Sequence, residues 1–175
     1  MTATPAVIAA PGASVINVAT TTATAPGIYT LTITGTSGAL TKVRTVSLRV
    51  RPEGTVDNPF PSTDTPISIP DNNVTGINST INVNRPIAIQ EVQVELNITH
   101  TFIGDLRVTL TSPTGTLVTL HNRAGGAADN IHQTYTFPTE FVGQQGAGAW
   151  VLHVDDNAGL DVGTLDNWTL HLIGV

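Results

Sequence analysis

The chain alternates apolar and polar residues in short runs that are separated by turn-forming residues. In the first third, the alternating runs are Val15–Val18, Ile28–Thr34 and Val43–Val50, all rich in β-branched residues. A period of two with this composition predicts half-buried strands. Pro26-Gly27 and Thr36–Gly38 supply turns between them. We therefore expect a three-stranded antiparallel piece at the start of the chain.

The remainder of the chain repeats this pattern. Its expected strands are Ile87–Ile98, Leu106–Leu110, Leu117–Leu120, Trp150–Val154 and Trp168–Ile173. The first of them slips by one residue near Gln90, which predicts a β-bulge. Ser112–Gly115 has proline and glycine where a type I turn favours them. No window of about 11 residues shows helical periodicity with caps, so we predict an all-β fold, a jelly-roll β-sandwich.

A proline-rich stretch divides the chain. Four prolines lie between Arg51 and Pro66, counting Pro66 itself, and proline favours extended, semi-rigid backbone. The net charge changes at the same place, from +1 over residues 1–66 to −7 over residues 67–175. We expect a partial β domain over 1–50, a linker over 51–66 and a jelly-roll domain over 67–175.

The first part is short for a sandwich. Its order of a Pro-Gly-x-Tyr-Thr-Leu-Thr strand from Pro26 to Thr32 and then a hairpin resembles the closing strands of a bacterial immunoglobulin-like module. Such a sandwich needs about seven strands and about 100 residues. An incomplete one exposes an apolar face and an unpaired edge. We expect a partner there: the second domain, an upstream segment or a neighbouring copy.

Composition excludes several classes of protein. The 175 residues include no cysteine, so disulfides and thiolate metal sites are absent. Only 11% of residues are charged and the net charge is −6, which argues against a nucleic-acid or anionic-membrane partner. No apolar run approaches the roughly 20 residues of a membrane helix. The first residues lack a basic segment followed by an apolar core, so no secretion signal is predicted.

Residues for catalysis are not apparent. Gly35–Ala39 matches the Gly-Thr-Ser-x-Ala stretch of subtilisin-like proteases, but Ser37 falls in a predicted hairpin turn, without a base or an orienting carboxylate. No His-Glu-x-x-His motif occurs. Asp155 and Asp156 are neighbours at a strand end, so their side chains should diverge and not form a catalytic pair. The five histidines are dispersed, and we interpret each as a packing or hydrogen-bonding residue: His100, His121, His132, His153 and His171.

The acidic residues suit calcium better. Asp155–Gly163 contains three carboxylates, one asparagine and two glycines directly after a predicted strand. Calcium takes six to eight oxygen ligands from such loops. The alternative is an ordinary acidic turn. Asp105 and Asp129 could join from other loops, which makes the candidate Ca²⁺ ligands Asp105, Asp129, Asp155, Asp156 and Asp161.

Several segments carry a resemblance to a known family. They are Ile69–Asn73, His100–Leu110, Thr111–Thr116, Leu120–Arg123, Gly148–Val154 and Gly163–Leu170, in that order. They resemble the P domain (P/Homo B domain) that follows the catalytic unit of proprotein convertases and many bacterial secreted proteases. The resemblance covers about residues 67–175. It implies a jelly-roll sandwich without catalytic residues, attached to a protease whose folding and stability it supports, and often binding calcium in bacterial members.

The resemblance also bears on the acidic positions. The acidic positions that the resemblance implies are Asp105 of the Gly-Asp-Leu motif, Asp129, and Asp156 and Asp161 of the last loop. Asp155 is an additional acid. The chain departs from the family in one respect, because a partial immunoglobulin-like part, and no catalytic domain, precedes the matching region.

Three functions follow as hypotheses. The first is a secreted, non-enzymatic accessory module whose partner is a catalytic protease domain. The second is a subunit of an extracellular filament or surface layer, in which a neighbouring copy completes the N-terminal sandwich through its β edge. The third is a carbohydrate-binding module, and it rests on fold analogy. Its candidate aromatic residues are Trp150, Trp168, Tyr29 and Tyr135, but we expect both tryptophans in the core.

Overall fold

The computed structural model describes residues 2–4, 6–9 and 11–175. Within this part of the chain every regular element is a strand except for one short 3₁₀ turn, so the all-β prediction is confirmed. None of the described helices could cross a membrane. The chain divides into two compact units, Met1–Glu53 and Gly54–Val175.

The first unit contains two separate two-stranded sheets. Its strands are β1 (Thr2–Thr4), β2 (Val15–Asn17), β3 (Gly27–Ser37) and β4 (Leu40–Val50). β3 and β4 form a hairpin in which Gly38 has a φ of +57°, a conformation that glycine adopts without strain. The expected three-stranded piece is wrong, because β2 pairs with β1 and not with β3. Alternation identifies a strand but does not identify its partner.

The β3–β4 hairpin has one apolar face. Leu31 lies opposite Val46, and Tyr29 lies opposite Leu48, so these four side chains share a side. Tyr29 and Val46 are exposed, and Leu31 and Leu48 are half-buried. An uncovered apolar face is what the sequence predicts for an incomplete sandwich. The immunoglobulin-like assignment stays a prediction.

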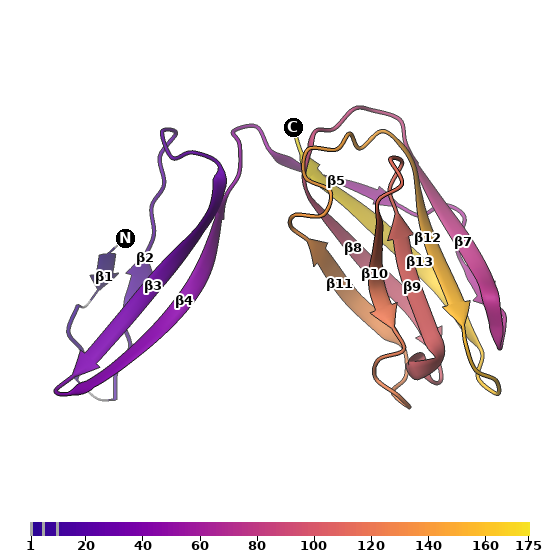
Figure 1. Cartoon of the computed structure of the whole chain (residues 1–175), viewed down its shortest axis with the longest axis horizontal. Coiled ribbons are helices and arrows are strands. Elements are labelled where there is room, and N and C mark those ends of the chain that lie inside the picture. The colour runs from indigo at the N-terminus through magenta and orange to yellow at the C-terminus, as the bar shows by residue number, and fades with distance from the viewer. Residues whose placement is uncertain (1, 5, 10) are drawn as a thin grey trace. The chain divides into compact units, whose positions relative to one another are not determined.

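The second unit is a β-sandwich of two antiparallel sheets (Figure 1). Its elements are β5 (Val56–Pro61), β6 (Ile67–Ile69), β7 (Asn73–Val83), β8 (Ile89–His100), the 3₁₀ turn η1 (Ile103–Asp105), β9 (Leu106–Thr111), β10 (Leu117–Asn122), β11 (Ile131–Phe137), β12 (Gly148–Asp156) and β13 (Gly163–Gly174). One sheet has the order β10-β9-β12-β7. The other has the order β11-β8-β13-β5, and β6 also pairs with β13.

The core lies between the two sheets and consists of the alternate, inward residues of their strands. Trp150 and Trp168 are fully buried there, as predicted. Each indole N–H is satisfied: Trp150 donates to the Gly146 carbonyl at 2.9 Å and Trp168 donates to the Ser79 hydroxyl at 2.7 Å. These hydrogen bonds offset the cost of removing each indole N–H from water when the ring is buried.

Two local predictions are confirmed. The pairs Ile173–Glu91 and Gly174–Ile89 leave Gln90 as the extra residue of a β-bulge. In the Ser112–Gly115 turn, the Gly115 amide donates to the Ser112 carbonyl at 2.9 Å, as the closing bond of a β-turn does.

The expected linker is wrong over much of its length. Residues 56–61 form β5, which pairs with β13 and belongs to the second unit. β5 is an edge strand, and Pro59 and Pro61 occupy alternate positions in it. The two prolines therefore lack backbone N–H groups on the same side of the strand. An edge strand tolerates proline where that side faces away from the sheet. The division between the units falls after Glu53.

Candidate functional site

The acidic residues gather at the end of the sandwich where β12 stops. β9 begins at Leu106, which lies opposite Asp156 on β12. The following residue, Asn157, donates its backbone amide to the Asp105 carbonyl at 2.9 Å and its side-chain amide to the same oxygen at 3.2 Å. Strand pairing thus places Asp105 of η1 beside the Asp155–Asp156 pair, although 52 positions separate Asn157 from Asp105 in the chain.

Asp155 is held by protein donors. Its carboxylate is fully buried, and Oδ2 accepts from Arg107 Nε at 2.9 Å and lies 2.9 Å from the terminal guanidinium nitrogen Nη2. His153 Nε2 lies 3.2 Å from the same oxygen, and the Asn157 side-chain amide donates to Oδ1. A buried carboxylate needs such compensation. Protein groups thus contact both oxygens of the Asp155 carboxylate.

Asp156 has different partners. Its Oδ2 lies 3.2 Å from His100 Nε2, and its Oδ1 accepts from the Ala158 amide at 3.1 Å. The Phe102 amide donates to His100 Nδ1 at 3.1 Å, so Nε2 carries the ring proton and donates to Asp156. The two neighbouring carboxylates therefore contact different groups, in agreement with the expected divergence of their side chains.

The other three candidates are less enclosed by donors. Asp105 is 7% exposed, and no described residue donates a hydrogen bond to its carboxylate. Asp161 accepts from the Thr101 hydroxyl at 2.6 Å. Asp129 is exposed, in a loop attached to η1 by the Gly104 amide, which donates to the Gly126 carbonyl at 2.9 Å. Over the described residues, no three His, Asp or Glu side chains come together as a metal-binding group.

Within the first unit, nothing supports catalysis at Ser37. It ends β3 opposite Leu40 in the hairpin, as expected, and all five histidines of the sequence belong to the second unit. A serine nucleophile needs an adjacent base. His153 and His171 lie in β12 and β13, as the sequence predicts, and His171 contacts Asp57 through Nδ1 at 2.9 Å.

Sequence reasoning missed one surface altogether. β11 was not expected as a strand, although Ile131, Gln133, Tyr135 and Phe137 alternate along it. With its neighbours, β11 lines a hollow of about 330 Å³ at an edge of the sandwich. Apolar residues at three of the four alternate positions of Ile131–Phe137, interrupted by Gln133, were the signal that could have identified this strand.

Comparison with known proteins identifies the region that contains these features. Residues 89–172 match the sequence model of the family described as the proprotein convertase P-domain. Residues 89–172 therefore resemble a P domain. The matched region spans β8 to β13, and it therefore includes Asp105, Asp129, Asp155, Asp156 and Asp161.

Curated relatives of the P domain come from bacteria. Leupeptin-inactivating enzyme 1 of Streptomyces exfoliatus is 40% identical over 106 residues, which are 59% of this chain and 24% of that protein. A calcium-dependent protease of Trichormus variabilis is 41% identical over 92 residues, 48% of this chain and 14% of that protein. The transglutaminase-activating metalloprotease of Streptomyces mobaraensis is 39% identical over 80 residues, 45% of this chain and 10% of that protein. The chain therefore spans a quarter or less of their length.

Solved structures support the fold. The serine protease of Aeromonas sobria, in complex with its chaperone, matches with a TM-score of 0.57 and 19% identity. The match covers 82% of this chain and 36% of the protease. The same protease alone matches with a TM-score of 0.54. At this identity the likeness concerns the fold, and it agrees with a β-sandwich.

Proposed function

We propose that this chain is a non-catalytic accessory region of a secreted bacterial protease, and that its P domain supports the folding and stability of the catalytic part. The observation that carries the proposal is the P-domain match over residues 89–172. The relatives that share this region are much longer than it, and two of the three described above are named as proteases. An extracellular location follows from the same proposal.

A domain exchange tests the accessory role. The region of the Streptomyces exfoliatus enzyme that aligns with this chain would be deleted or replaced by residues 54–175. We expect deletion to lower the yield of active secreted enzyme and the replacement to restore it. The matched control carries Val154→Asp, which places a charge at a fully buried core position and should abolish the rescue. A replacement no better than the deletion contradicts the proposal, as does peptidase activity of this chain alone.

Calcium is the ligand that we propose for the loop end of the P domain. Support comes from Asp105, whose carboxylate accepts no hydrogen bond from a described residue, and from the names of the two calcium-dependent proteases among the relatives. Asp105 is the leading candidate ligand, with Asp129, Asp156 and Asp161 as further candidates. A bound calcium ion would place a positive charge beside the Asp105 carboxylate.

Thermal unfolding with calcium or with a chelator tests this site. A cation bound only to the folded state raises Tm by mass action, so we expect Tm to be several degrees higher in calcium than in chelator. Asp105→Asn should remove the difference. Asp166→Asn should retain the difference, because the Asp166 carboxylate accepts a hydrogen bond from the Thr99 hydroxyl at the surface. Equal Tm values for the unaltered chain with and without calcium contradict the site.

A further inference from the structure

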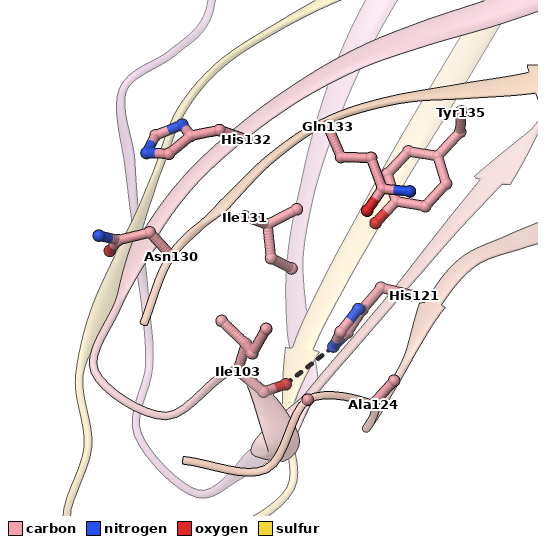
Figure 2. Close-up of a pocket in the computed structure, with 9 residues that line it drawn as sticks. Ile103, His121, Ala124, Asn130, Ile131, His132, Gln133 and Tyr135 are labelled. Carbon is pink, nitrogen blue, oxygen red and sulfur yellow. Dashed lines mark hydrogen bonds between the residues drawn. The ribbon is translucent and has the colours of Figure 1, made fainter. Parts of the chain in front are cut away.

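The two sheets of the second unit leave a hollow between their β10 and β11 edges (Figure 2). The hollow has a volume of about 330 Å³, which lies in the range of natural binding pockets. β11 contributes Ile131, Gln133 and Tyr135, β10 contributes His121, and η1 contributes Ile103. No Asp, Glu, Lys or Arg is among its lining residues. It therefore suits an uncharged group, because it offers a charge no counter-ion.

His121 gives the hollow an acceptor without a described partner. The residue is only 8% exposed, and its Nε2 lies 2.8 Å from the Ile103 carbonyl oxygen. A carbonyl only accepts, so Nε2 carries the proton and Nδ1 of the neutral ring is an acceptor. No described residue donates to Nδ1. In Figure 2 the dashed line joins the His121 ring to the Ile103 carbonyl oxygen, and Gln133 and Tyr135 are drawn above that ring.

Tyr135 adds a hydroxyl without a partner in the described chain. Burial raises the pKa of Tyr135, so the hydroxyl stays protonated and can donate or accept. The Gln133 side chain beside it is exposed and makes no hydrogen bond with a described residue. The hollow thus combines apolar walls with a few unsatisfied polar groups, a combination typical of binding sites.

The strand beside the hollow has an open edge. β11 pairs with β8 on one side and ends its sheet. It has no proline and no Asp, Glu, Lys or Arg, which are the residues that natural edge strands use against strand addition. The opposite edge, β5, has two prolines and Asp57. β10 carries an irregularity between Thr119 and His121.

We propose that the β11 edge binds an extended, uncharged peptide, which adds a strand to this sheet and places a tyrosine side chain in the hollow. Alternate side chains of an added strand face the same side as those of its neighbour, here the side of Ile131, Gln133 and Tyr135. The tyrosine ring packs against Ile103 and Ile131, and its hydroxyl donates to His121 Nδ1. Tyrosine combines an apolar ring with an uncharged donor at its tip. The proposal does not depend on the protease association or on calcium.

Binding can be tested by NMR on the full 175-residue chain labelled with ¹⁵N. The probe is acetyl-Thr-Val-Tyr-Val-Thr-amide, and the comparison peptides have Phe or Ala at the centre. We expect shift changes concentrated on the β11 amides and His121. The Phe peptide should bind several-fold more weakly because one hydrogen bond is lost, and the Ala peptide at least tenfold more weakly. Changes that lie elsewhere, or equal binding of the three peptides, overturn the proposal.

Two neighbouring positions give matched variants. Gln133→Glu places a charge at the hollow, whereas Thr136→Glu places one on the opposite face of the same strand; both positions are exposed. We expect the first to weaken the Tyr peptide at least tenfold and the second to change its affinity less than twofold. Equal losses contradict the proposal.

If the Gln133→Glu variant does not give the native NMR spectrum, Tyr135→Phe is used in its place. We expect this variant to bind the Tyr peptide a few-fold more weakly. 4-Methylphenol is the remaining probe. If it saturates the hollow at the concentration at which the Tyr peptide binds, a small-molecule site is indicated and the peptide proposal is wrong.

Discussion

At the scale of single residues, the acidic end of the sandwich depends on how each carboxylate is compensated. Asp155 contacts Arg107, His153 and Asn157, and Asp156 contacts His100 and a backbone amide. Asp105 has none of these partners. The sequence could identify the acidic residues but not these differences, because they arise from pairing between β9 and β12, which lie far apart in the chain.

The Arg107–Asp155 pair gives a first prediction. Arg107→Met leaves a fully buried carboxylate with fewer donors, so the free energy of unfolding should fall by about 2 kcal/mol or more in urea titrations. Arg107→Met combined with Asp155→Leu should be more stable than Arg107→Met alone, since no unpaired charge is then buried. A double variant less stable than the single one contradicts this interpretation.

Tyr135 gives a prediction about alkaline pH. Burial raises the pKa of Tyr135 in the folded state above the value of about 10 in the unfolded state. Its contribution to stability is complete below that unfolded value, and it is lost as the pH rises through the folded value. Tyr135→Phe should therefore lose less stability than the unaltered chain between about pH 9 and pH 11 in thermal unfolding. If the stability of the two proteins falls equally with pH over this range, the prediction is wrong. Tyr29 is the other tyrosine in the sequence, and it is present in both proteins.

At the scale of elements, strands with clear apolar alternation were predictable, and strands interrupted by proline or polar residues were not. β8, β12 and β13 alternate because their inward residues form the core. β7 escaped prediction because asparagines, a glycine and a serine interrupt its apolar residues. β5 was not predicted because its prolines are typical of a linker, although proline is also compatible with an edge strand of a sheet. Partners of strands in the first unit could not be predicted, since pairing depends on the fold as a whole.

β5 gives a prediction for truncation. Residues 67–175 are the domain expected from sequence, and residues 54–175 are the unit in the structure. Phe60 packs on the core, and the Asn58 side chain donates to the Leu172 carbonyl at 2.9 Å. The shorter chain loses both contacts and exposes the β13 edge. Its Tm should be lower than that of residues 54–175 by more than about 10 °C in calorimetry. Equal Tm values would restore the linker interpretation.

At the scale of the whole molecule, the two units differ in charge and in construction. Residues 1–53 carry a net charge of +3, and residues 54–175 carry −9. The first unit has two-stranded sheets, which are marginally stable in water, whereas the second has a continuous core between two sheets. The stability of the chain should therefore be concentrated in the second unit.

Limited trypsin digestion checks this difference. Trypsin should cut first in β4, which contains Lys42, Arg44 and Arg49, because local opening of a two-stranded sheet requires little free energy. Proline after Arg51 protects that bond, so the resistant fragment should begin at Val50 when measured by mass spectrometry. Early cleavage after Arg107, in the middle of the sandwich, contradicts the prediction.

The position of β13 has a consequence for how the sandwich assembles. This strand follows its partners β5, β6 and β8 in the chain, yet it lies between β8 on one side and β5 and β6 on the other. During synthesis, β5 and β8 therefore emerge before the strand that joins them. Their apolar faces stay uncovered until residues 163–174 have been synthesised. Closure over such sequence distances is slow. The newly made chain passes through an interval in which its sheet edges are open to aggregation or to a chaperone, and that interval ends when β13 inserts.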